Sequence, residues 1–394
     1  MIQKLKQYDF TLMITPILLA GFGIVMIYSA SMVIAVMDGH EGTHYFFKQI
    51  QWFVLSMIGF TICSVFPYKY YQKLMKIIVL FILILLVGVL IFGKEVNYAK
   101  SWFDFGAVSL QPAEFAKIGL IIYLASIYSK KQNYINDFNK GVLPPLVLTG
   151  IIIGLIVMQP DIGSAAIIFL IACSVIFSSG IRFKHLSILI LVGLILIAIA
   201  IPNMVTEERL ARVTGAYQPF ETPESDGYHL IQSYLAIGVG GITGEGLGHS
   251  VQKLGYLQEP HTDFIMAVIA EELGFVGVII VIGMLAIIVL RGIFIARKCE
   301  DSFGALLAIG ISSMIGIQAF INLGAISGVL PITGVPLPFV SYGGSSLLVL
   351  LTSMGILNNI AKTVKKREAE PVVVNKKTDD NRTFNRGGRK SWTS

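Results

Sequence analysis

The sequence predicts an all-α integral membrane protein with about ten transmembrane helices. Its 394 residues are 55% hydrophobic and only 14% charged, with a mean hydropathy of +0.75, whereas soluble domains carry about 25% charged residues. Apolar runs of about 20 residues, the length that a helix needs to cross a bilayer, recur along the chain. Lipid offers the backbone no hydrogen-bond partners, so these runs must be helical. The first run, 11–36, is too long for a cleavable signal peptide.

Each predicted span is bounded by charged or turn-forming residues. Span four begins at Gln111-Pro112, and Pro160 separates spans five and six almost without a loop, because proline starts helices and interrupts them. Span eight begins at Asp263, and span ten follows a segment with three prolines. The ten spans are 11–36, 48–66, 74–93, 112–128, 142–158, 161–180, 186–202, 263–290, 303–330 and 340–361.

A long polar loop, 203–262, lies between spans seven and eight. It carries seven acidic and three basic residues. Its closely spaced glycines favour tight turns, and no flanking strand and helix support their superficial likeness to a dinucleotide-binding fingerprint. Residues 233–237 are predicted to form a short amphipathic helix on the membrane face. The loop returns to the membrane through Glu259-Pro260-His261-Thr262-Asp263-Phe264.

The Lys and Arg residues predict the orientation. Without the C-terminal tail, 13 of them lie on the side of the N-terminus and six on the opposite side. The positive-inside rule therefore places both termini in the cytoplasm and the loop 203–262 outside the cell.

The net charge of +6 comes from the C-terminal tail. Residues 362–394 contain ten Lys and Arg against four Asp and Glu, and the rest of the chain is neutral. We therefore predict a membrane domain at 1–366 and a disordered, basic cytoplasmic tail at 367–394, and no nucleic-acid partner. The three cysteines are far apart and indicate neither disulfides nor a metal site.

Asp263, at the mouth of span eight, is the main candidate for catalysis, because an acid at membrane depth is costly and usually functional. The alternative is that it only caps the helix. Span eight also holds Glu271 and Glu272, which point in different directions on a helix. One of them is expected to bond to a neighbouring helix.

Spans four and six begin with further polar residues. Glu114 and Lys117 share one helix face and can pair, either as a neutral interfacial pair or as part of a polar cavity. Asp161 follows Pro160 and either caps span six or also lines that cavity. Before span ten, the irregular stretch from Pro331 to Ser346 lines a cavity or forms a plain re-entrant connection.

These motifs, in this order, resemble the SEDS family (shape, elongation, division and sporulation). The resemblance covers residues 8–362 and is carried by Gln111-Pro112-Ala113-Glu114, Gln159-Pro160-Asp161, Glu259 to Phe264 and Pro338 to Ser346. Gln258 and Ala113 depart mildly from its pattern. Four further stretches resemble the cell-division branch rather than the elongation branch, and a sporulation relative would look similar: Tyr8-Asp9, Tyr28 to Ser31, Gln252 to Leu257, and Asn358 to Ile360.

The resemblance implies a peptidoglycan glycosyltransferase in the bacterial cell membrane, at the division septum, that polymerises lipid II. It also implies a class B penicillin-binding protein as transpeptidase partner, besides other division proteins and membrane lipids. Asp263 is then the catalytic residue. Further substrate-binding residues are expected to be Lys117, Glu114, Asp161, His261, Thr262, Glu259, Ser341 and Tyr342.

The polymerisation chemistry fits a single inverting displacement, in which one carboxylate takes a hydroxyl proton. Lys117, Arg209 or Arg212 would neutralise the diphosphate. No cofactor is specified, and a divalent cation is compatible with the chemistry although no ligand cluster specifies one. A lipid II flippase and a non-catalytic scaffold for division enzymes are the alternative functions.

Overall fold

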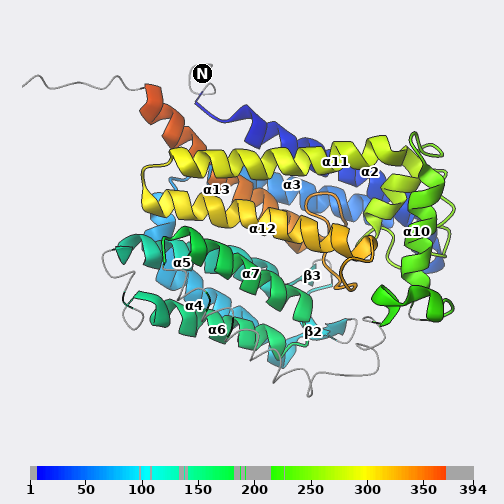
Figure 1. Cartoon of the computed structure of the whole chain (residues 1–394), viewed down its shortest axis with the longest axis horizontal. Helices are drawn as coiled ribbons and strands as arrows, with labels where there is room; N and C mark the ends of the chain where they lie inside the picture. Colours follow the sequence, from blue (N-terminus) through cyan, green and yellow to red (C-terminus); the bar gives the residue numbers. More distant parts are fainter. Residues whose placement is uncertain are drawn as a thin grey trace, which may run out of the picture.

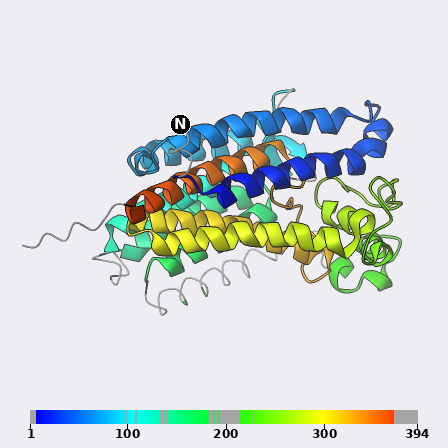
Figure 2. The same cartoon turned by 90° about the horizontal axis from the view of Figure 1, so that it is seen from above.

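A computed structural model describes residues 7–96, 99–106, 109–132, 137, 141–181, 187, 191, 214–225 and 227–369 of the chain. Within these ranges it is a long bundle of helices (Figures 1 and 2). The helices are α2 (Phe10–Met37), α3 (His44–Val65), α4 (Lys69–Phe92), α5 (Pro112–Lys130), α6 (Leu143–Val157), α7 (Ile162–Ser178), η3 (Pro219–Glu221), α10 (Tyr228–Gly240), α11 (Ile265–Lys298), α12 (Ser302–Ile326) and α13 (Gly344–Ala369).

Six of these helices are long and apolar enough to cross a membrane, namely α2, α3, α4, α11, α12 and α13. Helices α6 and α7 are apolar but shorter, and α5 has 19 residues. The chain is a multi-pass, largely helical membrane protein, as the sequence predicts. The tail 370–394 and, apart from residues 187 and 191, the span predicted at 186–202 lie outside the described residues. Helix α13 continues to Ala369, past the predicted domain boundary at 366.

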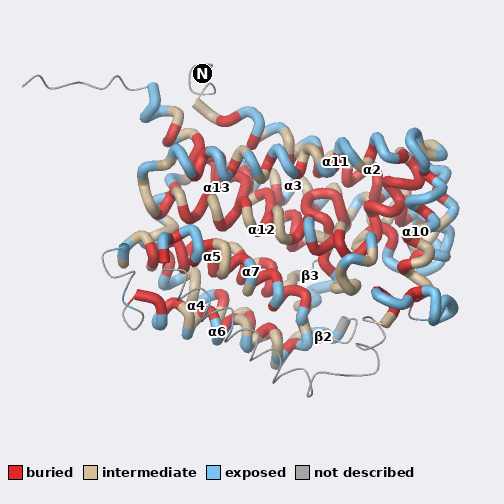
Figure 3. Tube along the Cα trace, viewed as in Figure 1, coloured by how far each residue is buried: buried red, intermediate tan, exposed pale blue. Residues whose placement is uncertain are grey.

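Helices α12 and α13 lie at the centre of the bundle. In their most apolar windows, 67% and 78% of the residues are buried, against 22% in α3 and α4 (Figure 3). The outer face of α4 exposes large apolar side chains such as Ile77 and Phe81, which suits contact with lipid. The polar side chains in the centre of the bundle are therefore shielded from lipid by the outer helices.

A small antiparallel sheet, absent from the sequence-based expectations, connects α4 to α5. It contains β1 (Lys94–Val96), β2 (Ala99–Asp104) and β3 (Ser109–Leu110) in that order. Trp102 pairs with Lys94 and Phe103 with Leu110. The sheet lies at the same end of the bundle as α10 and the segment 259–264, which we call the motif end; α2 begins and α13 ends at the other end (Figure 1).

Helix α11 is interrupted at Gly274, although the sequence predicts one continuous span. Gly274 has φ +64° and ψ −163°, a conformation that only glycine adopts readily. The loop backbone at 241–246 fills the break: Glu245 and Gly246 donate to the carbonyls of Glu271 and Glu272 at 3.0 Å. Backbone groups freed inside the membrane protein thus find partners in the loop.

Candidate active site

The segment 259–264 forms the turn that leads into α11, and distant residues hold its main chain. The N–H of Tyr342 donates to the carbonyl of His261 at 2.9 Å. The Ser341 hydroxyl donates to the carbonyl of Thr262 at 2.6 Å and accepts a backbone N–H at 2.8 Å. The Ser341 side chain therefore positions the turn, and its predicted contact with substrate stays a prediction.

The main chain of Asp263 is also held by a hydrogen bond from a distant residue. The side-chain amide of Asn322 on α12 donates to the carbonyl of Asp263 and to that of Val335, both at 2.8 Å. A Cβ added at Gly334, where φ is +72°, would lie 3.7 Å from the Asp263 carboxylate. The carboxylate thus lies beside the segment 331–343, on a backbone that α12 fixes in place, and it is only partly buried.

Asp263 does not cap α11. The helix begins at Ile265 with Phe264 as its N-cap residue, and no side chain accepts a hydrogen bond there. The prediction that Asp263 is only the N-cap residue of span eight is therefore wrong, because Asp263 precedes the N-cap residue by one position.

Glu259 and Thr262 pair at the exposed start of the turn. The Thr262 hydroxyl lies 2.7 Å from a carboxylate oxygen of Glu259. The backbone N–H of Thr262 also donates to the carbonyl of Glu259 at 3.1 Å. Glu259 has φ +52°, in the left-handed region that non-glycine residues seldom adopt. The strained residue lies at the start of the turn that leads into α11.

His261 is buried at the centre of an aromatic group. Its side chain is 5% exposed, and its ring centroid lies 4.6 Å from that of Tyr45 and 5.6 Å from that of Tyr342. Burial lowers the pKa of His261 below its usual range, because the charged imidazolium loses hydration. The neutral ring connects α3, the 259–264 turn and the segment before α13.

Asp161 caps α7, which confirms the predicted capping role. Its carboxylate accepts the N–H of Ser164 at 3.0 Å and a side-chain N–H of Gln111 at 3.0 Å. The start of α7 packs closely on the segment beside Asp263, since a Cβ on Gly163 would lie 2.7 Å from the carbonyl of Thr333. The segment 331–343 therefore lies between the helix that carries Asp161 and the turn that carries Asp263.

Glu114 and Lys117 form the ion pair that their spacing predicts. The Lys117 ammonium lies 2.6 Å from Glu114, and the two side chains are 1% and 4% exposed. The second carboxylate oxygen of Glu114 is buried and has no hydrogen-bond partner in the described part of the chain. An unsatisfied oxygen beside an ion pair is costly unless a ligand donates to it. Lys117 is directed at Glu114, so its contact with substrate stays a prediction.

A second buried ion pair was not recognised from the sequence. Lys253, in the loop before the turn, lies 2.5 Å from Glu272 of α11, with side chains 4% and 0% exposed. The Ser29 hydroxyl of α2 donates to the same carboxylate at 2.6 Å. The position of Glu272 in an apolar span could have indicated this pair, because a buried acid there requires a partner.

The neighbouring Glu271 points to different partners, as the helical geometry predicts. Its carboxylate accepts from the Ser250 hydroxyl at 2.5 Å and from the N–H of Val251 at 2.7 Å. Both carboxylates bind the loop 250–253, and Glu272 also binds α2. The loop is thereby anchored six to nine residues before the 259–264 turn begins.

Three further predictions concern a short helix in the loop, its two arginines and a metal site. The short helix predicted at 233–237 is confirmed and extends over α10 (Tyr228–Gly240). Arg209 and Arg212 lie outside the described residues. Within the described ranges, no group of three or more His, Cys, Asp or Glu side chains could hold a metal ion.

Comparison with known proteins identifies the family. Residues 10–366 match the family model FTSW_RODA_SPOVE, described as "Cell cycle protein". The probable peptidoglycan glycosyltransferase FtsW of Bacillus subtilis (strain 168) is 51% identical over 385 residues, which cover 94% of this chain and 95% of the relative. Stage V sporulation protein E of the same organism is 37% identical, covering 92% of this chain and 99% of the relative.

Solved structures show the same fold. A chain from a study titled "Structural coordination of polymerization and crosslinking by a peptidoglycan synthase complex" has a TM-score of 0.74 at 28% identity and covers 91% of this chain and 98% of that chain. The rod shape determining protein RodA of Thermus thermophilus has a TM-score of 0.66 at 26% identity, covering 90% of this chain and 96% of that chain. This chain belongs to the FtsW, RodA and SpoVE family of cell cycle proteins, the family that its motifs resemble.

Proposed function

We propose that this chain is a peptidoglycan glycosyltransferase that polymerises lipid II into glycan strands, with Asp263 as the general base. The observation that carries the proposal is the partly exposed Asp263 carboxylate at the motif end, on a backbone held by Asn322, Ser341 and Tyr342. A family relative named as a probable peptidoglycan glycosyltransferase, 51% identical over nearly the whole chain, supports the activity.

The reaction is one displacement at the anomeric carbon of the donor sugar. The 4-hydroxyl oxygen of the acceptor sugar forms the new bond to this carbon, and the bond to the diphosphate oxygen breaks with its electron pair. Asp263 takes the proton of the hydroxyl as its oxygen attacks. The α linkage of the donor becomes a β linkage in the product, so one carboxylate suffices and no covalent intermediate forms.

Glu114, Lys117 and Asp161 are proposed to bind the substrate deeper in the bundle. The Glu114–Lys117 pair lies within the first two turns of α5, and the free oxygen of Glu114 is available to a donor group of the substrate. Displacement of Glu114 from Lys117 would free the ammonium for the departing diphosphate, since a cation at the leaving group stabilises the charge that develops there.

The proposed activity is tested with purified protein and lipid II. We expect glycan strands from the protein together with a class B penicillin-binding protein whose transpeptidase is inactivated, and no strands from that partner alone. Translocation of labelled lipid II across vesicle membranes without strand synthesis would instead establish the flippase alternative. Absence of both activities, in a protein that still binds the partner, would support a scaffold.

The cellular role is proposed to be septal wall synthesis. The chain is more similar to the FtsW relative than to the sporulation protein of the same organism, at 51% and 37% identity. The structural neighbour from a peptidoglycan synthase complex supports a transpeptidase partner. Both termini are proposed to be cytoplasmic, with the motif end outside the cell.

The orientation gives a direct prediction. With Cys63, Cys173 and Cys299 replaced by serine, Glu221→Cys is expected to react with a membrane-impermeant thiol reagent in intact cells, and Lys130→Cys to react only after permeabilisation. Both positions are exposed and lie at opposite ends of the bundle, so accessibility to the reagent reports the side of the membrane. The reverse pattern would place the motif end in the cytoplasm and refute the proposed site of reaction.

A further inference from the structure

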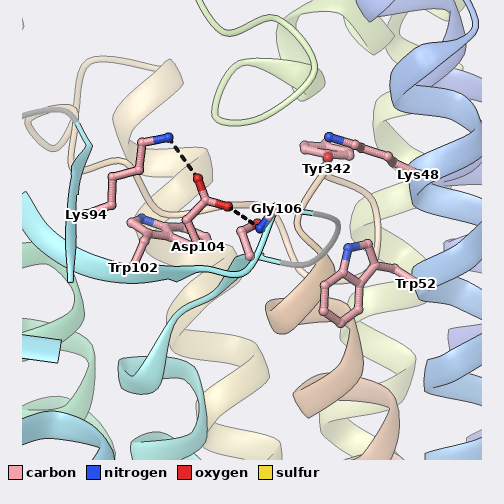
Figure 4. A pocket seen from close by; sticks show the side chains of 8 residues that line it. Lys48, Trp52, Lys94, Trp102, Asp104, Gly106 and Tyr342 are labelled. Carbon is pink, nitrogen blue, oxygen red and sulfur yellow. Dashed lines mark hydrogen bonds and ion pairs between the residues drawn. The ribbon is translucent and has the colours of Figure 1, made fainter. Parts of the chain in front are cut away.

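A cavity of about 350 Å³ lies between α3, the small sheet and the segment that leads into α13. Its volume falls within the range of small-molecule sites, about 300–1,000 Å³. Apart from Tyr342, no residue of the proposed catalytic site lines it. Figure 4 shows the sheet residues on one side of the cavity, and the α3 residues with Tyr342 on the other. The lining residues are Lys48, Trp52, Lys94, Trp102, Asp104, Gly106, Ser109 and Tyr342.

The aromatic lining suits a sugar ring. Trp52, Trp102 and Tyr342 come from three separate elements, and two of the three tryptophans in the whole chain line this one cavity. A pyranose ring has a face of C–H groups that packs on the electron-rich face of an aromatic ring, and its edge carries hydroxyls and amides. Asp104 and Ser109 supply polar groups for such an edge.

The lining is also positively charged. Lys94 is balanced by Asp104, whose carboxylate lies 2.8 Å away, and both are substantially exposed. Lys48 has no carboxylate partner among the described residues. The cavity therefore has one uncompensated cation at its rim, which favours a ligand with an anionic group.

The cavity adjoins the proposed catalytic turn, and hydrogen bonding and close packing fix its lining on that side. The Tyr342 N–H donates to the carbonyl of His261, so the residue that lines the cavity also fixes the turn before Asp263. Trp52 is 8% exposed and packs directly on Gly344, where an added Cβ would collide with the indole. A sugar ring in the cavity would thus contact Tyr342, which is hydrogen-bonded to the catalytic turn.

We propose that this cavity is a subsite for an amino-sugar ring that carries an anionic substituent. The proposal rests on the proposed function, because that reaction supplies two sources of such a ring. One source is the incoming lipid-linked saccharide with its diphosphate, and the other is the growing strand, whose stem peptides carry free carboxylates. In either case Lys48 binds the anion, and Trp52 and Trp102 contact the ring.

Tryptophan fluorescence tests the proposal directly. In a Trp392→Phe protein, only the two cavity tryptophans emit. We expect a saturable fluorescence change either with a lipid-free tetrasaccharide of alternating N-acetylglucosamine and N-acetylmuramic acid that carries its stem peptides, or with lipid II alone. A response to the tetrasaccharide assigns the subsite to the growing strand, and a response restricted to lipid II assigns it to the incoming substrate. No response to either ligand would overturn the proposal.

Variants of Lys48 test the charge. Lys48→Ala is expected to weaken binding about tenfold or more, the range of a lost charge-assisted hydrogen bond, and Lys48→Arg to retain it. Lys100→Ala is the matched control, because Lys100 lies on β2, the strand that carries Trp102, but donates to the carbonyl of Ile91 and does not line the cavity. A neutral tetramer of N-acetylglucosamine that binds as tightly as the charged oligomer would refute the role of Lys48.

Kinetics separate this proposal from the proposed function. Lys48→Ala should raise the KM for lipid II about tenfold with kcat nearly unchanged, whereas loss of the base lowers kcat. Parental KM and parental binding in Lys48→Ala would remove the subsite and leave the glycosyltransferase proposal intact. A cavity that binds the saccharide in a protein that makes no strands would refute the proposed function and leave the subsite.

Discussion

Asp263→Asn is expected to lower the rate of glycan-strand synthesis by at least about a hundredfold, because an amide cannot accept the proton of the attacking hydroxyl and general-base catalysis contributes about 10²–10⁴-fold. Binding of lipid II and the melting temperature should stay near the parental values. Asn has nearly the size of Asp, and the backbone of residue 263 is held through its carbonyl by Asn322. Strand synthesis, lipid II binding and thermal melting of the two purified proteins are the measurements.

Asp301→Asn is the matched control for this substitution. Asp301 is also an acid at a helix start, where it caps α12 through the N–H of Gly304 at 3.1 Å, but it lies at the opposite end of the bundle from the motif. Asn caps helices about as well as Asp, so this variant should synthesise strands close to the parental rate. If Asp263→Asn also polymerises at the parental rate, Asp263 is not the base.

Local sequence rules predicted the elements whose causes are local. The apolar runs predicted the spanning helices because burial of backbone polar groups in lipid requires them. Spacing alone predicted the Glu114–Lys117 pair, since residues three apart share a helix face. Asp161 was recognised as a cap because it directly follows a helix-breaking proline. In each case the hydrogen-bond or ion-pair partner lies within one helical turn of the residue from which the interaction is predicted.

Contacts between distant segments were not predictable in this way. The break at Gly274 depends on the loop backbone at 241–246, about thirty residues earlier, which satisfies the freed carbonyls. A single glycine in an apolar helix gives no sign of such a partner. The sheet at 94–110 was missed for a related reason, because its strands are short and their alternation is brief.

The structure explains several residues that first served only to indicate the branch of the family. Asp9 accepts from Arg291 at 2.8 Å, and its N–H donates to Asn358 at 3.0 Å. Ser29 and Lys253 both bind Glu272. These residues connect α2, α11, α13 and the loop, so their resemblance to the family reflects the packing of the bundle as well as the reaction.

Lys253→Met is expected to destabilise the protein by about 3–5 kcal/mol, the usual cost of leaving one charge of a buried ion pair without its partner. The Glu272 side chain is 0% exposed, and Ser29 alone would remain to solvate its carboxylate. The loop 250–253 would lose one of its two anchors on α11, and strand synthesis should fall because the 259–264 turn follows that loop. Thermal melting, limited proteolysis of the loop and strand synthesis measure the three effects.

The double variant Lys253→Met/Glu272→Met separates an uncompensated charge from lost packing. Replacement of both charges by apolar side chains of similar length should recover most of the melting temperature, because no buried charge remains. Lys298→Met is the control, since its pair with Glu368 is 42% and 50% exposed and such surface pairs contribute about 0–1 kcal/mol. A Lys253→Met protein that melts and polymerises like Lys298→Met would show that the buried pair does not anchor the loop. If the double variant regains stability but not strand synthesis, the pair is needed to position the turn that carries Asp263, beyond its contribution to folding.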